Sequence, residues 1–280
     1  MARLYNQRAK RRLIVKMLKK IRQIIATAAV VGLIFLFASC RKSAAPVDPA
    51  AVDSGDAQAA AEGIAEGDRL YAERGDLAKA RMAVAALRQA RTADYGNYEA
   101  AWKLARADYY LGSHGSGNEV DEAFREGVQA GKTAVQLNGD KPEGHFWLGA
   151  NYGGSAQQST LAGLSSVDDI RSEMETVIKM DESFQGGSAY LVLGQLYLEA
   201  PRVLGGDTAK AIGYLEKGLK IAPDNALMRV HLAEAYHAAG RDAEARKQID
   251  RLMAMTPPPD YVPEYQEAVE KGKKLLEKMK

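Results

Sequence analysis

The only cysteine of the chain, Cys40, is the residue whose surroundings predict a covalent reaction. A basic leader and a 15-residue apolar run, residues 24–38, precede it, and Ala38 and Ser39 are small. This order of basic, apolar and small residues is typical of a secretory signal. A cysteine directly after it is the residue at which a bacterial lipoprotein is cut and acylated. We therefore predict a signal peptide over residues 1–39 and a lipid anchor at Cys40, followed by a tether over 40–58.

Five details of this region refine the prediction. The position three before the cysteine is Phe37 instead of the usual leucine, so an incidental cysteine after a membrane anchor is the alternative. A spanning helix needs about 20 apolar residues, which favours the signal peptide. Met17 begins a complete signal by itself, and we expect translation to start there. Arg41, where aspartate would favour inner-membrane retention, favours the outer membrane. The tether has few large apolar residues, which predicts flexibility.

Charge is divided unevenly between the leader and the rest of the chain. The whole chain carries 38 basic and 36 acidic side chains, and residues 1–39 hold nine of the bases and none of the acids. Removal of the leader leaves 29 bases against 36 acids, a formal charge of −7. A nucleic-acid partner requires a basic surface to pair with phosphates. We therefore expect no nucleic-acid partner. The expected contact with the membrane is through the lipid on Cys40.

No arrangement of residues predicts catalysis, a cofactor or a metal site. The chain lacks the His-Glu-x-x-His and Gly-x-Ser-x-Gly motifs. His231 and His237 are six residues apart, so they cannot share one face of a helix as metal ligands. The glycine-rich stretch 112–118 follows a predicted helix and lacks the Lys-Ser/Thr ending of a phosphate loop. We therefore predict that the protein is not an enzyme.

A helical repeat must position the binding residues. Apolar side chains recur at spacings of three and four from about residue 59 onward, which is typical of amphipathic helices. The segment 226–259 matches the 34-residue tetratricopeptide pattern. Its small, aromatic, turn and stop positions are Ala233, Ala245, Tyr236, Gly240 and Pro257. Small residues let two antiparallel helices approach, and the glycine and the proline end them.

The pattern recurs upstream with insertions. Tyr109, Tyr152 and Tyr197 occupy the position of Tyr236, and we expect all four to pack within their helix pairs. Glycine-rich or polar segments at 112–118, 153–166 and 199–207 interrupt the pattern as predicted loops, either plain linkers or functional ones. The sequence therefore predicts an all-α solenoid of four to five tetratricopeptide-type helix pairs over 59–259. A lysine-rich capping helix is predicted over 260–280.

Three segments resemble one family. Residues 142–153 (Pro-Glu-Gly-His-Phe-Trp-Leu-Gly-Ala-Asn-Tyr-Gly), 186–190 (Gly-Gly-Ser-Ala-Tyr) and 200–207 (Ala-Pro-Arg-Val-Leu-Gly-Gly-Asp) are similar to the T-component lipoproteins of tripartite ATP-independent periplasmic (TRAP) transporters. The resemblance spans most of residues 60–255. It implies an acylated periplasmic protein that associates with the transporter's solute-binding subunit and has a hydrophobic cleft, and it leaves a homo-oligomer open. A generic tetratricopeptide lipoprotein that shares the loop is the alternative.

Candidate binding residues follow from the repeat, in which the first helix of each pair lines a concave face. Phe146 and Trp147 are the aromatic ligand candidates, although a large aromatic residue in a helical repeat packs in the core more often than it contacts a ligand. The mixed lining suits a small ligand or an extended peptide. The candidates on this face are Lys103, Tyr110, Phe146, Trp147, Gln195, Glu234 and His237.

The Pro-Arg-x-x-Gly-Gly loop is a second candidate site. Arg202 either pairs with Asp207 to fix the loop or contacts a partner. Gly205 and Gly206 are expected to supply unusual backbone angles. The leading hypothesis is a membrane-anchored scaffold that binds a protein, for which the resemblance suggests a solute-binding subunit. The alternatives are a binder of a small hydrophobic ligand or lipid in the concave cleft and an envelope assembly factor.

Overall fold

The computed structural model describes residues 56–158, 160–257 and 261–280. The predicted signal peptide, the start at Met17, the lipidated Cys40 and most of the tether lie outside these residues. None of the helices in the described ranges combines the length and the apolar character needed to cross a bilayer.

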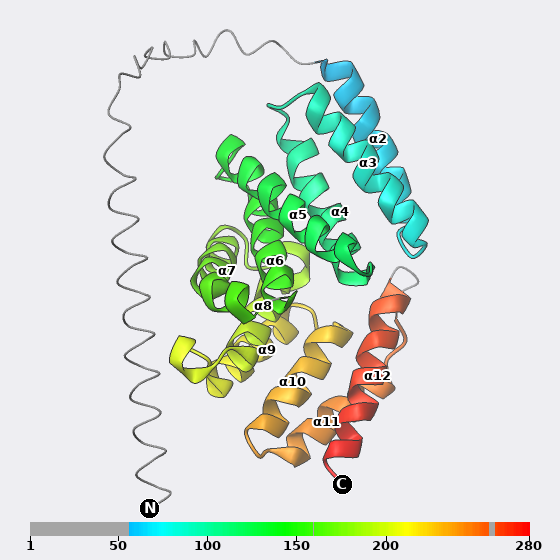
Figure 1. The fold of residues 1–280 in the computed structure, drawn as a ribbon. Coiled ribbons are helices and arrows are strands. Elements are labelled where there is room, and N and C mark those ends of the chain that lie inside the picture. The colour runs from blue at the N-terminus through cyan, green and yellow to red at the C-terminus, as the bar shows by residue number, and fades with distance from the viewer. Residues whose placement is uncertain (1–55, 159, 258–260) are drawn as a thin grey trace, which may run out of the picture. The chain divides into compact units, whose positions relative to one another are not determined.

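The described residues form α-helices and one short 3-10 helix, and contain no strand. Consecutive helices pack as five pairs, from α2 with α3 to α10 with α11, and α12 packs against α10 and α11 (Figure 1). This confirms the predicted all-α solenoid with a capping helix. The elements are α2 (Ala57–Ala72), α3 (Leu77–Ala93), α4 (Tyr98–His114), α5 (Asn118–Leu137), α6 (Pro142–Gln158), α7 (Thr160–Met180), α8 (Phe184–Glu199), η2 (Arg202–Leu204), α9 (Thr208–Ile221), α10 (Ala226–Ala238), α11 (Asp242–Met253) and α12 (Val262–Lys278).

Short polar side chains begin several of these helices. Each accepts a hydrogen bond from a backbone N–H in the first turn, where the helix itself supplies no acceptor. Because each of these residues directly precedes a helix, it fixes the point at which that helix starts. The capping residues are Asp56, Asp76, Asn97, Asp207 and Asn225.

Small residues let the paired helices approach closely. A Cβ on Gly67 of α2 would lie 2.5 Å from Cγ of Leu87 in α3. A Cβ on Gly194 of α8 would likewise lie 2.4 Å from Cγ of Leu215 in α9. Ala233 occupies the equivalent place in α10 and is fully buried. The close approach predicted from the small residues is therefore confirmed.

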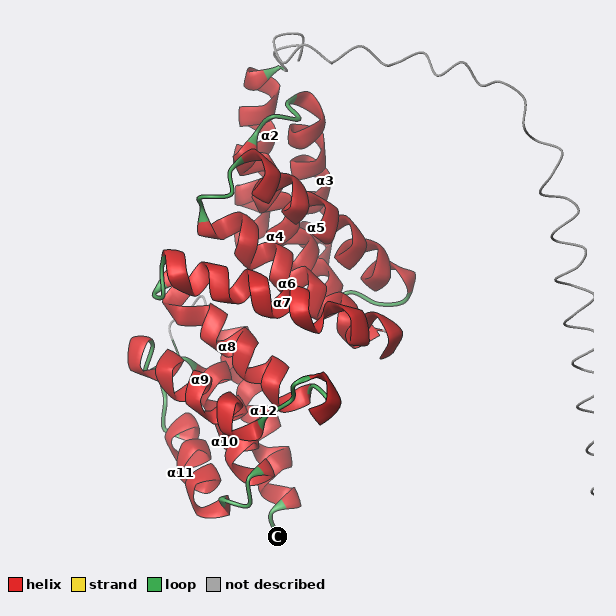
Figure 2. Cartoon of the chain, turned by 90° about the vertical axis from the view of Figure 1, so that its left-hand side faces the viewer, coloured by secondary structure: helices red, strands yellow, loops and turns green. Residues whose placement is uncertain are grey.

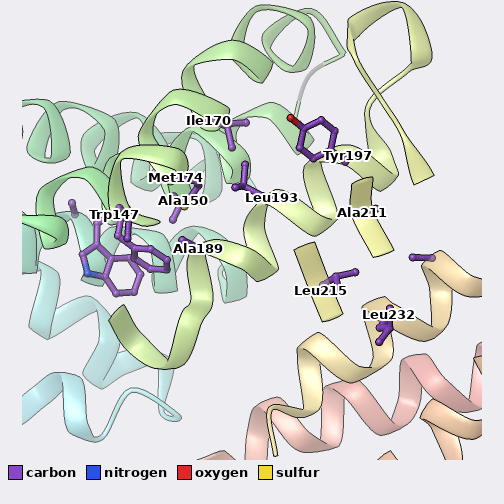
Figure 3. Close-up of a cluster of buried hydrophobic side chains, with 14 of the residues drawn as sticks. Trp147, Ala150, Ile170, Met174, Ala189, Leu193, Tyr197, Ala211, Leu215 and Leu232 are labelled. Atoms are coloured by element: carbon purple, nitrogen blue, oxygen red, sulfur yellow. The ribbon is translucent and has the colours of Figure 1, made fainter. Parts of the chain in front are cut away.

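One apolar core continues from repeat to repeat. Figure 3 shows side chains from its middle part, between Trp147 and Leu232, and these residues belong to one cluster of buried side chains. Tyr197 and Tyr236 are buried in this core, and Tyr109 and Tyr152 pack against it half-buried. The predicted packing role of the repeated tyrosines is confirmed. Figure 2 shows helices α2 to α11 stacked in chain order along the array.

The predicted loop at 112–118 does connect two helices but is shorter than expected, because α4 continues to His114 and α5 begins at Asn118. The predicted loop at 153–166 is largely helical, since α6 and α7 cover most of it. The reason is that Gly112 and Gly154 serve packing instead of turns. A Cβ on Gly112 would lie 2.8 Å from Phe124 Cε1, and one on Gly154 only 2.0 Å from it. Both glycines make room for the same aromatic ring. The third predicted loop, at 199–207, is present between α8 and α9.

The first and last elements of the array meet. Arg74, in the turn between α2 and α3, lies 3.6 Å from a carboxylate oxygen of Glu264 in the first turn of α12. Figure 1 shows this turn next to the start of α12. Both side chains are about a quarter to a third exposed, at 26% and 32%. The capping helix therefore contacts the beginning of the array as well as its end.

Candidate functional site

Helices α8, α10 and α12 bring together a cluster of polar side chains, called the α8–α10 cluster below. Its five members are Gln195, Glu199, His231, Glu234 and Lys271. Nε2 of Gln195 lies 2.7 Å from Nε2 of His231, and Nδ1 of His231 lies 2.7 Å from Oε2 of Glu234. The Gln195 amide donates to Nε2, so Nδ1–H is free to donate to the Glu234 carboxylate. His231 is buried, and these bonds fix its ring between two helices.

The pKa values of the two carboxyl groups in the α8–α10 cluster are shifted in opposite directions. Burial acts to raise the pKa of Glu234, but the hydrogen bond from His231 and the charges of Lys271 and Lys278 outweigh it and lower the pKa. Burial raises the pKa of Glu199, with a contribution from the charge of Glu234. Glu234 is therefore held ionised, and Glu199 takes up a proton more readily. The cluster can exchange hydrogen bonds with a polar ligand or peptide.

Lys103 and Tyr110 lie in a separate place, where α4 meets α2. The Lys103 ammonium is buried and forms ion pairs with Asp68 and Glu99. The Tyr110 ring stacks on His114 with 4.1 Å between ring centroids. These two candidates therefore already have partners within the chain, and another protein would have to compete for them.

Phe146 and Trp147 are placed in the core by α6. Their side chains are only 5% and 7% exposed, and their rings meet edge to face with 5.0 Å between centroids. Tyr109 and Phe184 complete the aromatic group. The indole N–H of Trp147 is buried and has no acceptor among the described residues. Contact of these two residues with a ligand stays a prediction.

The loop between α8 and α9 is fixed by its own backbone and by one side chain. Gly205 has φ 92°, the left-handed conformation that glycine adopts without strain. Gly206 is required for a different reason, because a Cβ there would lie 1.8 Å from the carbonyl oxygen of Ala200. Asp207 accepts hydrogen bonds from the N–H groups of Ala209 and Lys210, so its side chain caps α9. Arg202 is exposed beside it.

The structure thus joins some candidates and separates others. Gln195 and Glu234 meet through His231, whereas His237 lies at the end of α10 with Nδ1 2.7 Å from Oδ1 of Asp242. Sequence patterns alone do not mark Glu199, His231 or Lys271 as binding residues. Gln195 and His231 are 36 residues apart, about one repeat, and this spacing is the signal that could have linked them. The described residues contain no group of three or more His, Cys, Asp or Glu side chains placed to hold a metal ion.

Comparison with protein families decides what kind of array this is. The family described as TRAP transporter T-component matches residues 117–275, more than half of the chain. The chain belongs to the T-component family. The match includes both the α8–α10 cluster and the loop between α8 and α9. A search of curated proteins found no match to this T-component protein.

Solved structures support the fold of this T-component protein. A thermophilic tetratricopeptide protein from Thermus thermophilus has a TM-score of 0.56 at 22% identity, over 75% of this chain and 98% of that one. The MamA protein (TM-score 0.47, 20% identity, 79% and 95% coverage) and PilF of Pseudomonas aeruginosa (0.49, 16%, 79% and 92%) also match, at lower TM-scores. At such identities the likeness to the Thermus protein shows the fold alone.

Proposed function

We propose that this T-component protein is a lipid-anchored scaffold of the cell envelope that binds the solute-binding subunit of a TRAP transporter. The family match is the observation that carries the proposal. The signal-like residues before Cys40 support the anchor, and Arg41 supports the outer membrane facing the periplasm. The helical-repeat fold and the family both point to a component that works by binding and not by catalysis. Self-association follows only from the resemblance.

The loop between α8 and α9 is the surface that we assign to the partner. Val203 is 92% exposed, the most exposed large apolar side chain among the described residues. Arg202 precedes it, and arginine beside an apolar group is a frequent anchor at protein interfaces. Because Gly206 fits tightly and Asp207 caps α9, the loop is held in one shape. A preorganised loop loses less conformational entropy when it binds.

Replacement of the exposed valine tests this assignment. We expect Val203→Glu to reduce the recovery of a solute-binding subunit about tenfold or more, because a charge placed at an interface anchor must be desolvated without a partner. The measurement is crosslinking in intact cells, purification through the anchored protein and mass spectrometry of what is recovered. Met82→Glu on α3, where the methionine is 50% exposed, is the matched control and should leave recovery unchanged.

The proteins recovered by crosslinking distinguish the transporter hypothesis from the assembly-factor hypothesis. Equal recovery from wild type and Val203→Glu would show that the loop is not the binding surface. Recovery of envelope-assembly proteins alone would contradict the transporter proposal and favour an assembly factor.

A second candidate function is the binding of a small hydrophobic ligand. The buried indole N–H of Trp147 is the observation that favours it, since buried donors are normally paired and a largely apolar ligand with one acceptor atom would pair this one. Mass spectrometry of an organic extract from the purified protein tests it. A bound lipid or other apolar molecule in stoichiometric amount would support this function, and an empty extract would oppose it.

A further inference from the structure

Three basic side chains beside the loop between α8 and α9 have no acidic partner. Arg202 lies in the loop, Lys210 and Lys217 lie in α9, and all three are exposed. None of them forms an ion pair with another described residue. Residues 40–280 carry a formal charge of −7, so a group of unpaired cations differs from the composition of this part of the chain.

The two lysines are held on one side of α9. Lys210 and Lys217 share a face because seven residues span about two turns and about 10 Å of helix. Nζ of Lys210 lies 5.2 Å from the ring centroid of Tyr197. Nζ of Lys217 lies 5.8 Å from that of Tyr214. The two rings are stacked with 5.4 Å between centroids and 6° between planes, so cation–π contacts with one aromatic pair position both ammonium groups.

Arg171 of α7 connects this aromatic pair to the loop. Its Cζ lies 5.7 Å from the ring centroid of Tyr197. On the other side, a Cβ on Gly205 would lie 3.1 Å from its Nη2, so the guanidinium contacts the loop. The loop and the lysines of α9 therefore belong to one continuous surface. This surface is called the basic face below, and its exposed members are Arg202, Val203, Lys210 and Lys217.

The acids that border the basic face leave it with an excess of positive charge. Asp168 accepts a hydrogen bond of 2.6 Å from Arg171, so these two charges neutralise each other. The side chain of Asp207 caps α9. Glu216 accepts a hydrogen bond from the hydroxyl of Tyr236. Glu175 is the remaining acid whose charge acts on the aromatic pair, and the three unpaired cations outnumber it.

The position of Lys210 is unfavourable within the chain itself. It lies in the first turn of α9, which contains no acidic residue, and the positive end of the helix dipole repels a cation there. A carboxylate supplied from outside the chain would offset this repulsion. The lysine is therefore better explained by a contact with a partner than by the stability of α9.

We propose that the basic face binds an acidic surface of the partner protein. Carboxylates about 10 Å apart on the partner would pair with Lys210 and Lys217, while Val203 enters an apolar pocket. This inference rests on the proposed function and states the chemistry of the partner at the same surface. Complementary charges of this kind mainly set the choice of partner and the rate of association.

A bilayer surface fits the basic face less well. Binding to anionic lipids normally uses clusters of about four to eight cations, and interfacial helices also insert a broad apolar face. The basic face offers three unpaired cations and one exposed valine. The partner assigned to it is therefore a protein, and membrane contact is one of the outcomes that the experiments below distinguish.

Charge reversal in the crosslinking assay tests the proposal. We expect the double variant Lys210→Glu with Lys217→Glu to reduce recovery of the solute-binding subunit about tenfold or more. Replacement of both lysines by arginine keeps the charge and should keep recovery. Glutamate is favourable in the first turn of a helix, so the reversed variant should remain folded, which thermal melting checks.

Lys132 of α5 supplies the matched control. It is exposed, and its Nζ lies 5.7 Å from the ring centroid of Tyr152, so it repeats the lysine–tyrosine contact away from the basic face. Lys132→Glu should leave recovery unchanged. An equal loss with this variant would mean that net charge matters and not the basic face, and would overturn the proposal.

The outcomes separate this inference from the proposed function. If wild type yields the subunit, Val203→Glu does not and the double lysine reversal yields as much as wild type, the acidic partner surface is wrong and the proposed function stands. If wild type yields no solute-binding subunit, the proposed function fails and this inference fails with it.

Binding of the purified subunit to the full-length chain in detergent excludes the membrane. We expect the affinity to fall about tenfold or more between ~50 and ~500 mM NaCl, because salt screens exposed charges, and the double lysine reversal to remove most of this dependence. If the reversal lowers recovery in cells but leaves binding in detergent unchanged, the basic face contacts lipid and the proposal is overturned.

Discussion

Replacement of Trp147 by alanine is expected to lower the free energy of unfolding by about 3–5 kcal/mol. The indole is 7% exposed and lies between the rings of Phe146 and Tyr109, whose centroids are 5.0 and 5.8 Å away. Removing it leaves a cavity between α4 and α6 that the surrounding helices fill only in part. Chemical denaturation followed by far-ultraviolet circular dichroism measures the change.

The control for this prediction is an aromatic residue outside the core. Tyr95 is 65% exposed between α3 and α4, so Tyr95→Ala should alter stability by no more than about 0.5 kcal/mol. If Trp147→Ala instead retained full stability and lost a bound apolar ligand, the residue would be a ligand contact and not a core residue. The same experiment thus decides between the two interpretations of the aromatic pair.

Gly206→Ala is expected to destabilise the protein by about 1–3 kcal/mol and to displace the loop between α8 and α9. The new Cβ would lie 1.8 Å from the carbonyl oxygen of Ala200, and a backbone atom can move only if the loop moves with it. Because Val203 is carried by this loop, recovery of the solute-binding subunit should fall as well. Thermal denaturation and the crosslinking assay measure the two effects.

Gly213→Ala is the matched comparison. Gly213 lies within α9, and a Cβ there would have no neighbour within 4 Å. Alanine is the better helix former, so this substitution should stabilise the protein by about 0.5–1 kcal/mol. A Gly206→Ala protein as stable as wild type, with normal recovery of the partner, would show that the loop tolerates a side chain and is not fixed in the way described.

Sequence patterns predicted the repeat because the pattern itself encodes helix packing. Small residues such as Ala233, and tyrosines such as Tyr236, occupy the same offsets in successive units, and the helices pack as those offsets require. Glycine was less informative. It predicts a turn when it lies between helices, but Gly112 and Gly154 lie within helices and accommodate Phe124. That contact joins residues from three helices, and no local pattern shows it.

Polar contacts were harder to predict for a related reason. Gln195 contacts His231 across 36 residues, and Arg88 contacts Glu126 across 38, so each bond joins neighbouring repeats. Insertions make the repeats unequal in length, and the pairing register therefore cannot be obtained from a fixed 34-residue period. Asp108 of α4, which is 0% exposed, was missed because an acid on an amphipathic helix is expected to face solvent. Only the packing of α3, α4 and α5 against one another buries this side chain.

The contact between Arg74 and Glu264 has a consequence for how the array unfolds. In an open solenoid each repeat contacts only its neighbours, so either end can fray without affecting the other. An ion pair between the turn that joins α2 to α3 and the last helix, α12, makes the stability of one end depend on the other. A partly exposed ion pair contributes about 1 kcal/mol or less, so the link biases the ends toward contact without locking them. This ion pair by itself therefore couples the two ends of the array only weakly.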